Sequence, residues 1–293
     1  MVAISNVLEL KNIKENREVD LAILQQAEKT KKMYEGDYNR FFKYCMKGNR
    51  EPSFKSLEKY LYRTVTKDRL KLSTFNRRAA AVSYYLINVL DQTLTNEQLK
   101  RIQLIRQLYN DEEYRELKLM KGQSAQPKEE MLQLIEKLEV RAKAICLFNL
   151  VTACRPSEMI SIQLKYIDLE ARTVQVYIQK QKIWKVKRIT LQTVLAIKEY
   201  IAAYKLNNDD YFVGKVNRHN QYTSKKISEV AYRESIKKWL GVAPYTLRKT
   251  QISAMHAAGA DLATIAKQSG HKSLQTINEH YLEVDDVTLD KFL

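Results

Sequence analysis

The sequence predicts a mainly α-helical protein of two domains that contains one small β-hairpin. Apolar residues recur at helical spacing along most of the chain, which favours helices over strands. The chain has only 4 Pro and 7 Gly, so few loops are expected between the helices. At 293 residues it exceeds the usual size of a single domain, and two domains with separate cores are therefore expected.

The first domain, residues 1–120, is expected to be a helical bundle. Its first helix would cover residues 21–46, where Phe41 and Phe42 are among the core candidates. A second helix is expected to follow from Ser53, with Leu57, Tyr60 and Leu61 on one face.

The third and fourth helices of this domain carry more charge. The third is expected to be capped by Ser73, and its first turns hold Asn76, Arg77 and Arg78. These three side chains suit contacts with a DNA groove or backbone, although a solvated helix end explains them equally well. The fourth helix is expected over residues 96–119, where it would close the domain.

A linker is expected at residues 121–130, because Gly122 and Pro127 interrupt the helical periodicity between two charged helices. A flexible joint there would let two domains close around a duplex. The second domain would span residues 131–293, and its centre is the most apolar run of the chain, residues 141–162.

Two strands are expected in the second domain. Residues 173–178 and 186–191 alternate between apolar and polar side chains, and the lysine-rich segment QKQKIWK joins them as a hairpin. An amphipathic helix is expected at residues 191–204, and a loop followed by a helix at residues 207–235.

The charge balance indicates a polyanionic partner. Lys and Arg number 50 against 34 acidic residues, which gives a net charge of +16. Nucleic acid is favoured over a merely basic, soluble surface because this excess is large for the size of the chain.

Other classes of protein are disfavoured by the remaining composition. The 3 cysteines lack paired spacing, which is typical of reduced thiols in a cytoplasmic protein, here one that would associate with the nucleoid. No apolar run reaches the roughly 18 residues of a membrane span. The 4 histidines show no metal-ligand spacing with the cysteines, so neither a metal nor another cofactor is expected.

Residues 244–284 are expected to form three short helices that carry an arginine, a histidine and a tyrosine. Arg248 would open the first helix, His271 would follow the second, and Tyr281 would lie on the third. A guanidinium, an imidazole and a phenol suit phosphoryl transfer, because a phosphodiester has charged oxygens to neutralise and a phosphorus to attack. Glycines 259 and 270 are expected to end the first two helices, and Asp261 and Ser273 to cap the last two.

This block resembles the second conserved box of the tyrosine recombinases, the integrase family. That box contains H-x-x-R, then L-G-H, then a nucleophilic tyrosine, and Arg248, His271 and Tyr281 match it in order. Tyr245 stands where the family usually has its first histidine, and a phenol can still donate a hydrogen bond to a phosphate oxygen.

The stretch TACRPSEMISIQLKYIDLE resembles the first box of the same family, typically T-G-x-R-x-S-E. Arg155 then matches the first catalytic arginine and Glu158 its supporting acid. Taken without the resemblance, a plain Arg155–Glu158 ion pair would be the favoured interpretation. The family also has a hairpin lysine that protonates the leaving hydroxyl. Lys180 is expected in that role, with Lys182 as the alternate, while solubilising turn lysines remain the other interpretation.

The resemblance implies a site-specific DNA recombinase of the short Xer, Cre or transposon-resolvase type, with a helical core-binding domain and an α+β catalytic domain. Such an enzyme cleaves and rejoins double-stranded DNA through a 3′-phosphotyrosyl intermediate, in integration, excision or resolution. The acidic, apolar tail at residues 282–293 would dock on a neighbouring subunit of a tetramer, or else on its own domain. The alternative is a non-catalytic regulator that binds DNA through a helix-turn-helix near Gly259.

Overall fold

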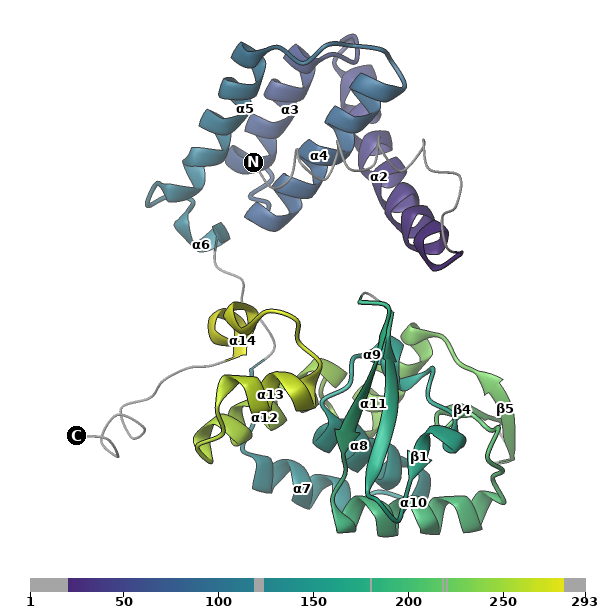
Figure 1. Ribbon diagram of the computed structural model, residues 1–293. Coiled ribbons are helices and arrows are strands. Elements are labelled where there is room, and N and C mark those ends of the chain that lie inside the picture. Colours follow the sequence, from purple (N-terminus) through teal and green to yellow (C-terminus); the bar gives the residue numbers. More distant parts are fainter. Residues whose placement is uncertain (1–20, 119–123, 180, 218, 220, 282–293) are drawn as a thin grey trace, which may run out of the picture. The chain divides into compact units, whose positions relative to one another are not determined.

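The structure is a computed structural model that describes residues 21–281 apart from 119–123, 180, 218 and 220 (Figure 1). The chain divides into two compact units, Met1–Lys121 and Gly122–Leu293, and the division falls inside the linker predicted at residues 121–130. The last residues of that predicted linker are helical, because α7 already begins at Lys128.

The first unit is built from helices. In order these are α2 (Leu21–Lys47), α3 (Phe54–Thr66), α4 (Leu72–Asn88), α5 (Asn96–Gln107), the 3₁₀ turn η1 (Leu108–Asn110) and α6 (Arg115–Lys118). Phe41, Leu57 and Leu86 are fully buried in their common core. Helix α3 follows Ser53 as predicted, and Ser53 caps it, because its hydroxyl accepts a hydrogen bond from the Ser56 N–H at 3.3 Å.

Three details of the first unit differ from the prediction. Phe42 is 41% exposed, since Phe41 takes the inward position and the next residue lies about 100° around the helix. The cap predicted at Ser73 is wrong, because α4 begins at Leu72 after Lys71. The helix predicted at 96–119 ends at Gln107 and is followed by η1 and α6.

The second unit mixes helices with two small sheets. Its elements are α7 (Lys128–Glu136), α8 (Val140–Thr152), α9 (Pro156–Met159), η2 (Leu164–Tyr166), β1 (Ile167–Asp168), β2 (Thr173–Ile178), β3 (Ile183–Arg188), α10 (Leu191–Tyr204), β4 (Gly214–Val216), β5 (Tyr222–Lys226), α11 (Glu229–Leu240), α12 (Pro244–Ala257), α13 (Leu262–Ser269) and α14 (Leu274–Tyr281). Helix α8 is the centre of the core, as predicted, with residues 144–152 all buried.

The three-stranded sheet is antiparallel in the order β1-β2-β3, and β2 pairs with β3 from Thr173↔Arg188 to Ile178↔Ile183. Strand β3 therefore lies three residues earlier than the predicted 186–191. The reason is that Thr190 caps α10 by accepting the Thr193 N–H at 3.2 Å, which ends the strand. The hairpin turn is thus short and consists of residues 179–182. The two-stranded sheet of β4 and β5 was not predicted.

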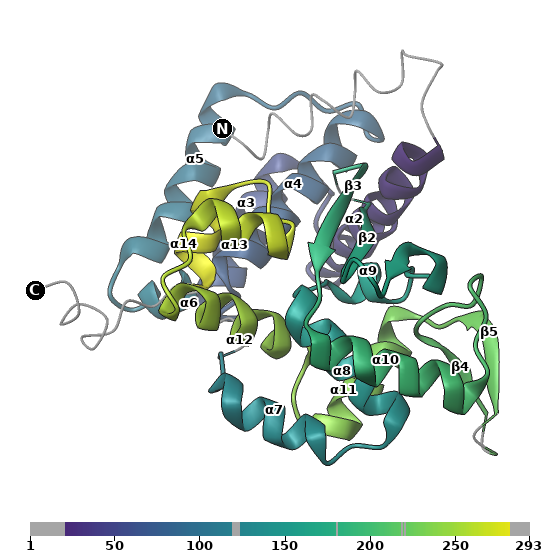
Figure 2. The same cartoon turned by 60° about the horizontal axis from the view of Figure 1, so that its bottom comes forward.

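The last three helices pack against one another, and α13 also contacts β3 (Figure 2). Helix α12 opens at Pro244 rather than at Arg248, because proline suits a first helical turn. Asp261 caps α13 as predicted, accepting the Thr264 N–H at 2.7 Å. The mainly helical class with small antiparallel sheets is confirmed. None of the helices in the described part of the chain is long and apolar enough for a membrane span.

Gly270 ends α13 in the left-handed conformation, with φ +79°. A Cβ atom at this position would lie 2.7 Å from Cδ1 of Ile178 at the end of β2. Glycine is therefore favoured by the left-handed backbone, and the end of the Ile178 side chain lies close to it. This approach places the hairpin turn beside His271, the residue that follows Gly270.

Candidate active site

Arg155 lies at the joint between α8 and α9, where it is the N-cap residue of α9. Its Nη1 donates to Oε1 of Glu158 at 2.8 Å, and its backbone N–H donates to Oε2 at 3.0 Å. The Glu158 side chain is 4% exposed, whereas 29% of the Arg155 side chain remains exposed. The carboxylate thus holds the guanidinium from the protein side while part of it still faces solvent.

Lys187 on β3 is a site residue that sequence reasoning missed. Its side chain is completely buried, and Nζ donates to the Thr152 carbonyl at 2.9 Å and to Sγ of Cys154 at 3.3 Å. Nζ also lies 3.6 Å from Oε2 of Glu158. Glu158 is consequently shared between two cations, Arg155 and Lys187.

This buried charge arrangement keeps Glu158 ionised. Burial pushes the pKa of the carboxyl upward, but Lys187 and Arg155, with a hydrogen bond from the backbone of Arg155, lower it below its ordinary value overall. A sequence signal for Lys187 did exist. It occupies an inward position of the strand opposite the buried Val174, and lysine is rarely buried unless it is paired.

Arg248 is the largest fully buried side chain among the described residues. Its Nη1 donates to the carbonyls of Ala153 and of Ser269, the latter at 2.9 Å, and its Nη2 lies 2.9 Å from Nε2 of His271. These contacts tie α12 to the end of α8 and to the end of α13. The guanidinium is therefore fixed close to the residues that precede Arg155 in the chain.

His271 is held on both sides of its ring. The Ser269 hydroxyl donates to the Ile265 carbonyl at 2.6 Å and lies 2.7 Å from Nδ1 of His271. Because the serine proton is used on Ile265, Nδ1–H is the donor to Ser269, and Nε2 is left to accept from Arg248. One neutral tautomer thus satisfies all of these bonds.

The charge state of His271 follows from its surroundings. Burial, and then the positive charges of Arg248, Arg155, Lys187 and Lys185, lower its pKa from 6.5 to about 3. The imidazole is consequently neutral near neutral pH and offers an acceptor rather than a charge. An anion entering the site would oppose these cations and make protonation of His271 easier.

The hairpin turn contacts the same region. Nε2 of Gln181 donates to the Gly270 carbonyl at 2.9 Å, so residues 179–182 lie against the turn that carries His271. Lys182 ends the hairpin turn with φ 54° and is half-buried. Lys180, the predicted proton donor, lies outside the described residues, so the choice between the two lysines stays a prediction.

Two arginines, a histidine and a hairpin that carries lysines are thus the groups of the candidate site. A comparison of the sequence with models of protein families identifies the family. The model of the phage integrase family matches residues 124–287. The chain belongs to the phage integrase family. Its predicted resemblance to the tyrosine recombinases is thereby confirmed, and the matched residues contain every position predicted for the two family boxes.

Curated relatives of this phage integrase chain are the tyrosine recombinases XerC of two strains of Staphylococcus epidermidis. Each is 28% identical over 174 residues, an alignment that covers 56% of this chain and 58% of the relative. The chain thus spans less than two thirds of the length of these relatives.

Solved structures of other recombinases share the fold. The Tn1549 transposon integrase in complex with transposon right end DNA is 14% identical, with a TM-score of 0.60 over 97% of this chain and 96% of that one. XerH bound to its difH substrate is 17% identical, with a TM-score of 0.59 over 88% and 78%. A lambda integrase dimer on a COC′ core site is 11% identical, with a TM-score of 0.59 over 96% and 98%. At these identities the likeness shows the fold alone.

Two tyrosines were also predicted as site residues. Tyr245 is 39% exposed in the first turn of α12, one turn before Arg248, so its phenol is accessible. Tyr281 is the last residue of α14, and its side chain lies outside the described residues. Ile277, one turn earlier on the same helix, is fully buried in a cluster with Ala153.

Three residues of the first unit were predicted to contact DNA. Two of them, Arg77 and Arg78, form hydrogen bonds within the protein. Arg77 donates to both carboxylate oxygens of the buried Asp37, at 2.7 and 3.1 Å. Arg78 donates to the Tyr60 hydroxyl at 3.0 Å and lies 3.8 Å from Asp37. Asn76 is half-buried. A DNA contact by these residues stays a prediction.

Proposed function

We propose that this phage integrase family member is a site-specific DNA recombinase that cleaves and rejoins strands through a 3′-phosphotyrosyl intermediate. The observation that carries the proposal is the hydrogen-bonded cluster around Arg248. It brings a second arginine and a histidine to the carbonyl of Ala153, two residues before Arg155. These groups come from separate parts of the chain, and a merely structural explanation does not account for so many buried cations in one place.

The proposed chemistry assigns a role to each group. Arg155, still partly exposed, and Arg248 would neutralise the nonbridging oxygens of the scissile phosphate as negative charge develops in the transition state. A phosphate oxygen that reached Nη2 of Arg248 would compete with Nε2 of His271 for that donor. Released in this way, the neutral His271 could accept the phenolic proton of Tyr281.

Tyr281 would attack phosphorus, and the hairpin lysine, Lys180 or Lys182, would protonate the departing 5′ oxygen. The phosphotyrosyl bond would conserve the energy of the broken phosphodiester, so rejoining needs neither ATP nor a metal. Tyr245 would donate a hydrogen bond to a phosphate oxygen in place of the histidine that the family usually has.

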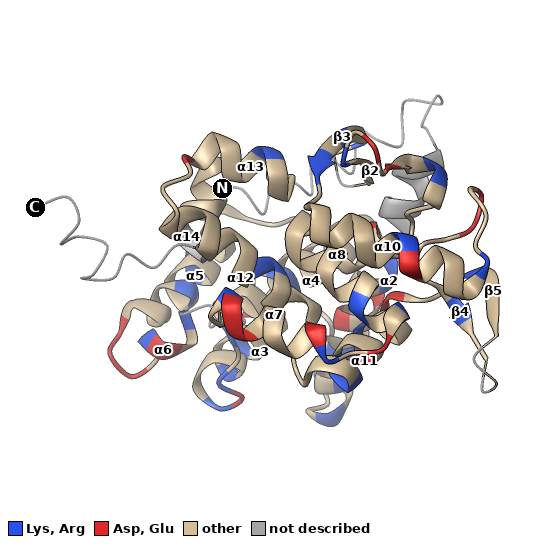
Figure 3. Cartoon of the chain, turned by 90° about the horizontal axis from the view of Figure 1, so that it is seen from below, with Lys and Arg blue, Asp and Glu red and all other residues tan. Residues whose placement is uncertain are grey.

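The proposed partner is double-stranded DNA, which several relatives hold in their structures. The net charge of +16 supports this choice. Figure 3 shows lysines and arginines on β3 and α13 of the second unit and on α6 of the first. Residues 1–120 would act as the core-binding domain and residues 131–293 as the catalytic domain. The tail at 282–293, through which a tetramer would assemble, lies outside the described residues.

Covalent trapping tests the proposal directly. A duplex nicked near its recombination site should accumulate a protein–DNA complex that survives denaturation, and Tyr281→Phe should abolish it without changing DNA affinity. Tyr62→Phe is the matched control, because it removes an exposed tyrosine hydroxyl that the proposed chemistry does not use. Trapping by the Tyr281→Phe protein would show that another residue attacks. The regulator alternative receives no support, since it explains neither the Arg155 pair nor the buried Arg248.

A further inference from the structure

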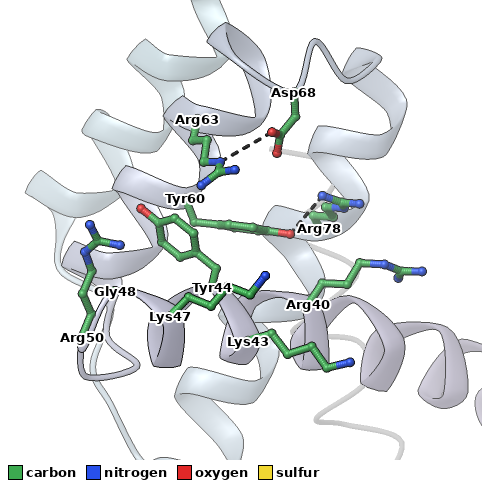
Figure 4. Close-up of a pocket in the computed structure, with 10 residues that line it drawn as sticks. All are labelled: Arg40, Lys43, Tyr44, Lys47, Gly48, Arg50, Tyr60, Arg63, Asp68 and Arg78. Carbon is green, nitrogen blue, oxygen red and sulfur yellow. Dashed lines mark hydrogen bonds and ion pairs between the residues drawn. The ribbon is translucent and has the colours of Figure 1, made fainter.

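A pocket of about 460 Å³ lies within the first unit, built from α2, α3, α4 and the loops after α2 and α3 (Figure 4). Its cationic lining residues are Arg40, Lys43, Lys47, Arg50, Arg63 and Arg78. Asp68 is the acidic residue among the lining side chains, and Tyr44 and Tyr60 supply the aromatic surface. Arg78 was predicted to contact DNA, and none of the lining residues belongs to the cluster around Arg248.

Helix α2 supplies one wall of this cationic pocket. Arg40, Lys43, Tyr44 and Lys47 recur at spacings of three and four residues, so one face of the helix presents them together. Figure 4 shows Arg40, Lys43 and Lys47 rising from the same helix, with Arg50 on the loop that follows. These cationic side chains therefore come together because of the helical spacing of α2 and the position of the loop that follows it.

Carboxylates balance only part of the positive charge in the pocket. Asp68 pairs with Arg63 at 3.5 Å. The buried Asp37 next to the pocket accepts contacts from three arginines, Arg40, Arg77 and Arg78, at 3.2, 2.7 and 3.8 Å, so it neutralises only one of them. The remaining cations keep an uncompensated charge.

Among the described residues, Lys43, Lys47 and Arg50 have no carboxylate within ion-pair distance, and all three are exposed. Arg50 and Arg63 lie over the Tyr44 ring, 5.0 and 5.8 Å from its centroid. A ring orients a guanidinium without neutralising it. Because two guanidiniums already contact the Tyr44 ring, the pocket is better suited to an anion than to a stacked base.

We propose that this pocket binds a phosphate group. Planar guanidiniums and flexible ammonium groups converging on one concave surface are the donors that phosphate oxygens prefer. The phosphate would be carried either by a nucleic-acid backbone or by a free phosphate compound. The backbone source rests on the proposed DNA function, whereas the free source is independent of it.

Two triple variants of the full-length chain separate the pocket from bulk charge. The pocket variant carries Lys43→Gln, Lys47→Gln and Arg50→Gln, which remove exposed cations that no carboxylate of the described residues holds. The control variant carries Lys55→Gln, Lys59→Gln and Lys100→Gln, three exposed lysines of α3 and α5 outside the pocket. Both lose the same charge, and circular dichroism with thermal unfolding checks that both fold.

Two probes distinguish the sources of phosphate. In the first arm, affinity for a duplex of random sequence is measured as a function of salt. A backbone source predicts binding at least ~10-fold weaker for the pocket variant than for the control, with a salt slope smaller by about 2 to 3. In the second arm, sodium pyrophosphate is titrated. A free source predicts a rise in the melting temperature of the wild type and the control but not of the pocket variant.

Identical behaviour of the two triple variants in both arms would overturn the proposal, because only total charge would then matter. A difference in either arm supports it and names the source. Neither arm requires strand cleavage. If no Tyr281 complex were trapped, the proposed recombinase function would be wrong, but the two binding measurements would still test the pocket. If the pocket variant and the control behaved alike, the pocket proposal would be wrong, but the trapping experiment would still test the recombinase function.

Discussion

The cationic cluster around Arg248 and the cationic pocket of the first unit handle positive charge in different ways. Arg248 and Lys187 are fully buried, and protein acceptors bind them from several sides. Lys43, Lys47 and Arg50 are exposed, without a carboxylate partner among the described residues. The free-energy cost of desolvating a buried cation is offset by its hydrogen bonds, and these bonds also hold the side chain in place before a ligand binds. An exposed cation attracts an anion from solution, but its side chain is not held in one position.

This difference predicts which measurement each region controls. Changes in the Arg248 cluster should alter both the free energy of unfolding and the rate of strand cleavage. Changes in the pocket should alter association with phosphate and its salt dependence but leave the free energy of unfolding nearly unchanged. If a pocket variant lost as much free energy of unfolding as a cluster variant, the two regions would not differ in this way.

The largest effect is expected for Arg248→Ala. Removal of this guanidinium leaves the carbonyls of Ala153 and Ser269 and Nε2 of His271 without their donor in a buried place. We expect a loss of about 2–4 kcal/mol in the free energy of unfolding. We also expect strand cleavage to fall at least about 100-fold, because a transition-state donor is lost. Urea denaturation and single-turnover cleavage measure the two effects.

Arg155→Ala is the matched control for that change. Arg155 is partly exposed, and Glu158 keeps Lys187 as a second cation when the arginine is removed. Cleavage should therefore fall as far as for Arg248→Ala, while stability falls less and DNA affinity hardly at all. If cleavage and affinity fell together for Arg155→Ala, the residue would be an anchor for DNA instead.

Lys187→Met should have the next largest effect, chiefly on stability. The variant keeps the volume but loses the hydrogen bond to the Thr152 carbonyl and one of the two cations beside Glu158. We expect a loss of about 1–3 kcal/mol in the free energy of unfolding. The control is Lys185→Met, two residues earlier on the same face of β3 and only half-buried. Equal losses for the two variants would mean that Lys187 has no special positioning role.

The fold was largely predictable because helical periodicity is a local signal. The three helices at residues 244–284 follow from Asp261, Gly270 and the apolar spacing, and the structure has all three. The errors concern boundaries, as for β3, where the cap at Thr190 outweighed the alternating pattern of residues 186–191. The sheet of β4 and β5 is too short for a pattern of its own.

The candidate site was predictable only in part. Motif order located Arg155, Arg248 and His271, and the structure confirms that Arg155 pairs with Glu158. Motif order could not show that Arg248 is completely buried, since burial depends on carbonyls contributed by α8 and α13. Lys187 was missed because it belongs to no motif, although its inward strand position was visible in the alternating pattern.

The pH dependence of stability tests the buried state of His271. Its pKa is about 3 in the folded protein and near 6.5 when unfolded. Between these values the unfolded chain binds a proton that the folded protein does not, so stability falls as pH drops below 6.5. From pH 7 to about pH 5 the loss should be about 1–2 kcal/mol. Glu158, whose pKa is lowered, loses its contribution only at lower pH.

Urea denaturation at the two pH values measures this loss, and His271→Gln is the control. Glutamine retains an oxygen that can accept from Arg248 but cannot take up the proton. The variant should therefore lose less stability between the two pH values than the wild type. The same dependence on pH in both proteins would show that His271 is not the group responsible.

The smallest effect is expected at Ala153, which occupies the glycine position of the family box. It ends α8 in the left-handed conformation, with φ 49°, and its carbonyl accepts from Arg248. Ala153→Gly relieves a backbone cost of about 1–2 kcal/mol but loses a buried methyl worth about 0.8 kcal/mol. A net gain below about 1 kcal/mol is expected in thermal or urea unfolding. The matched change Ala144→Gly, buried within α8, should destabilise instead, because glycine has no backbone advantage in a helix interior. If Ala153→Gly were as destabilising as Ala144→Gly, packing of the buried methyl group would outweigh the cost of the left-handed backbone at residue 153.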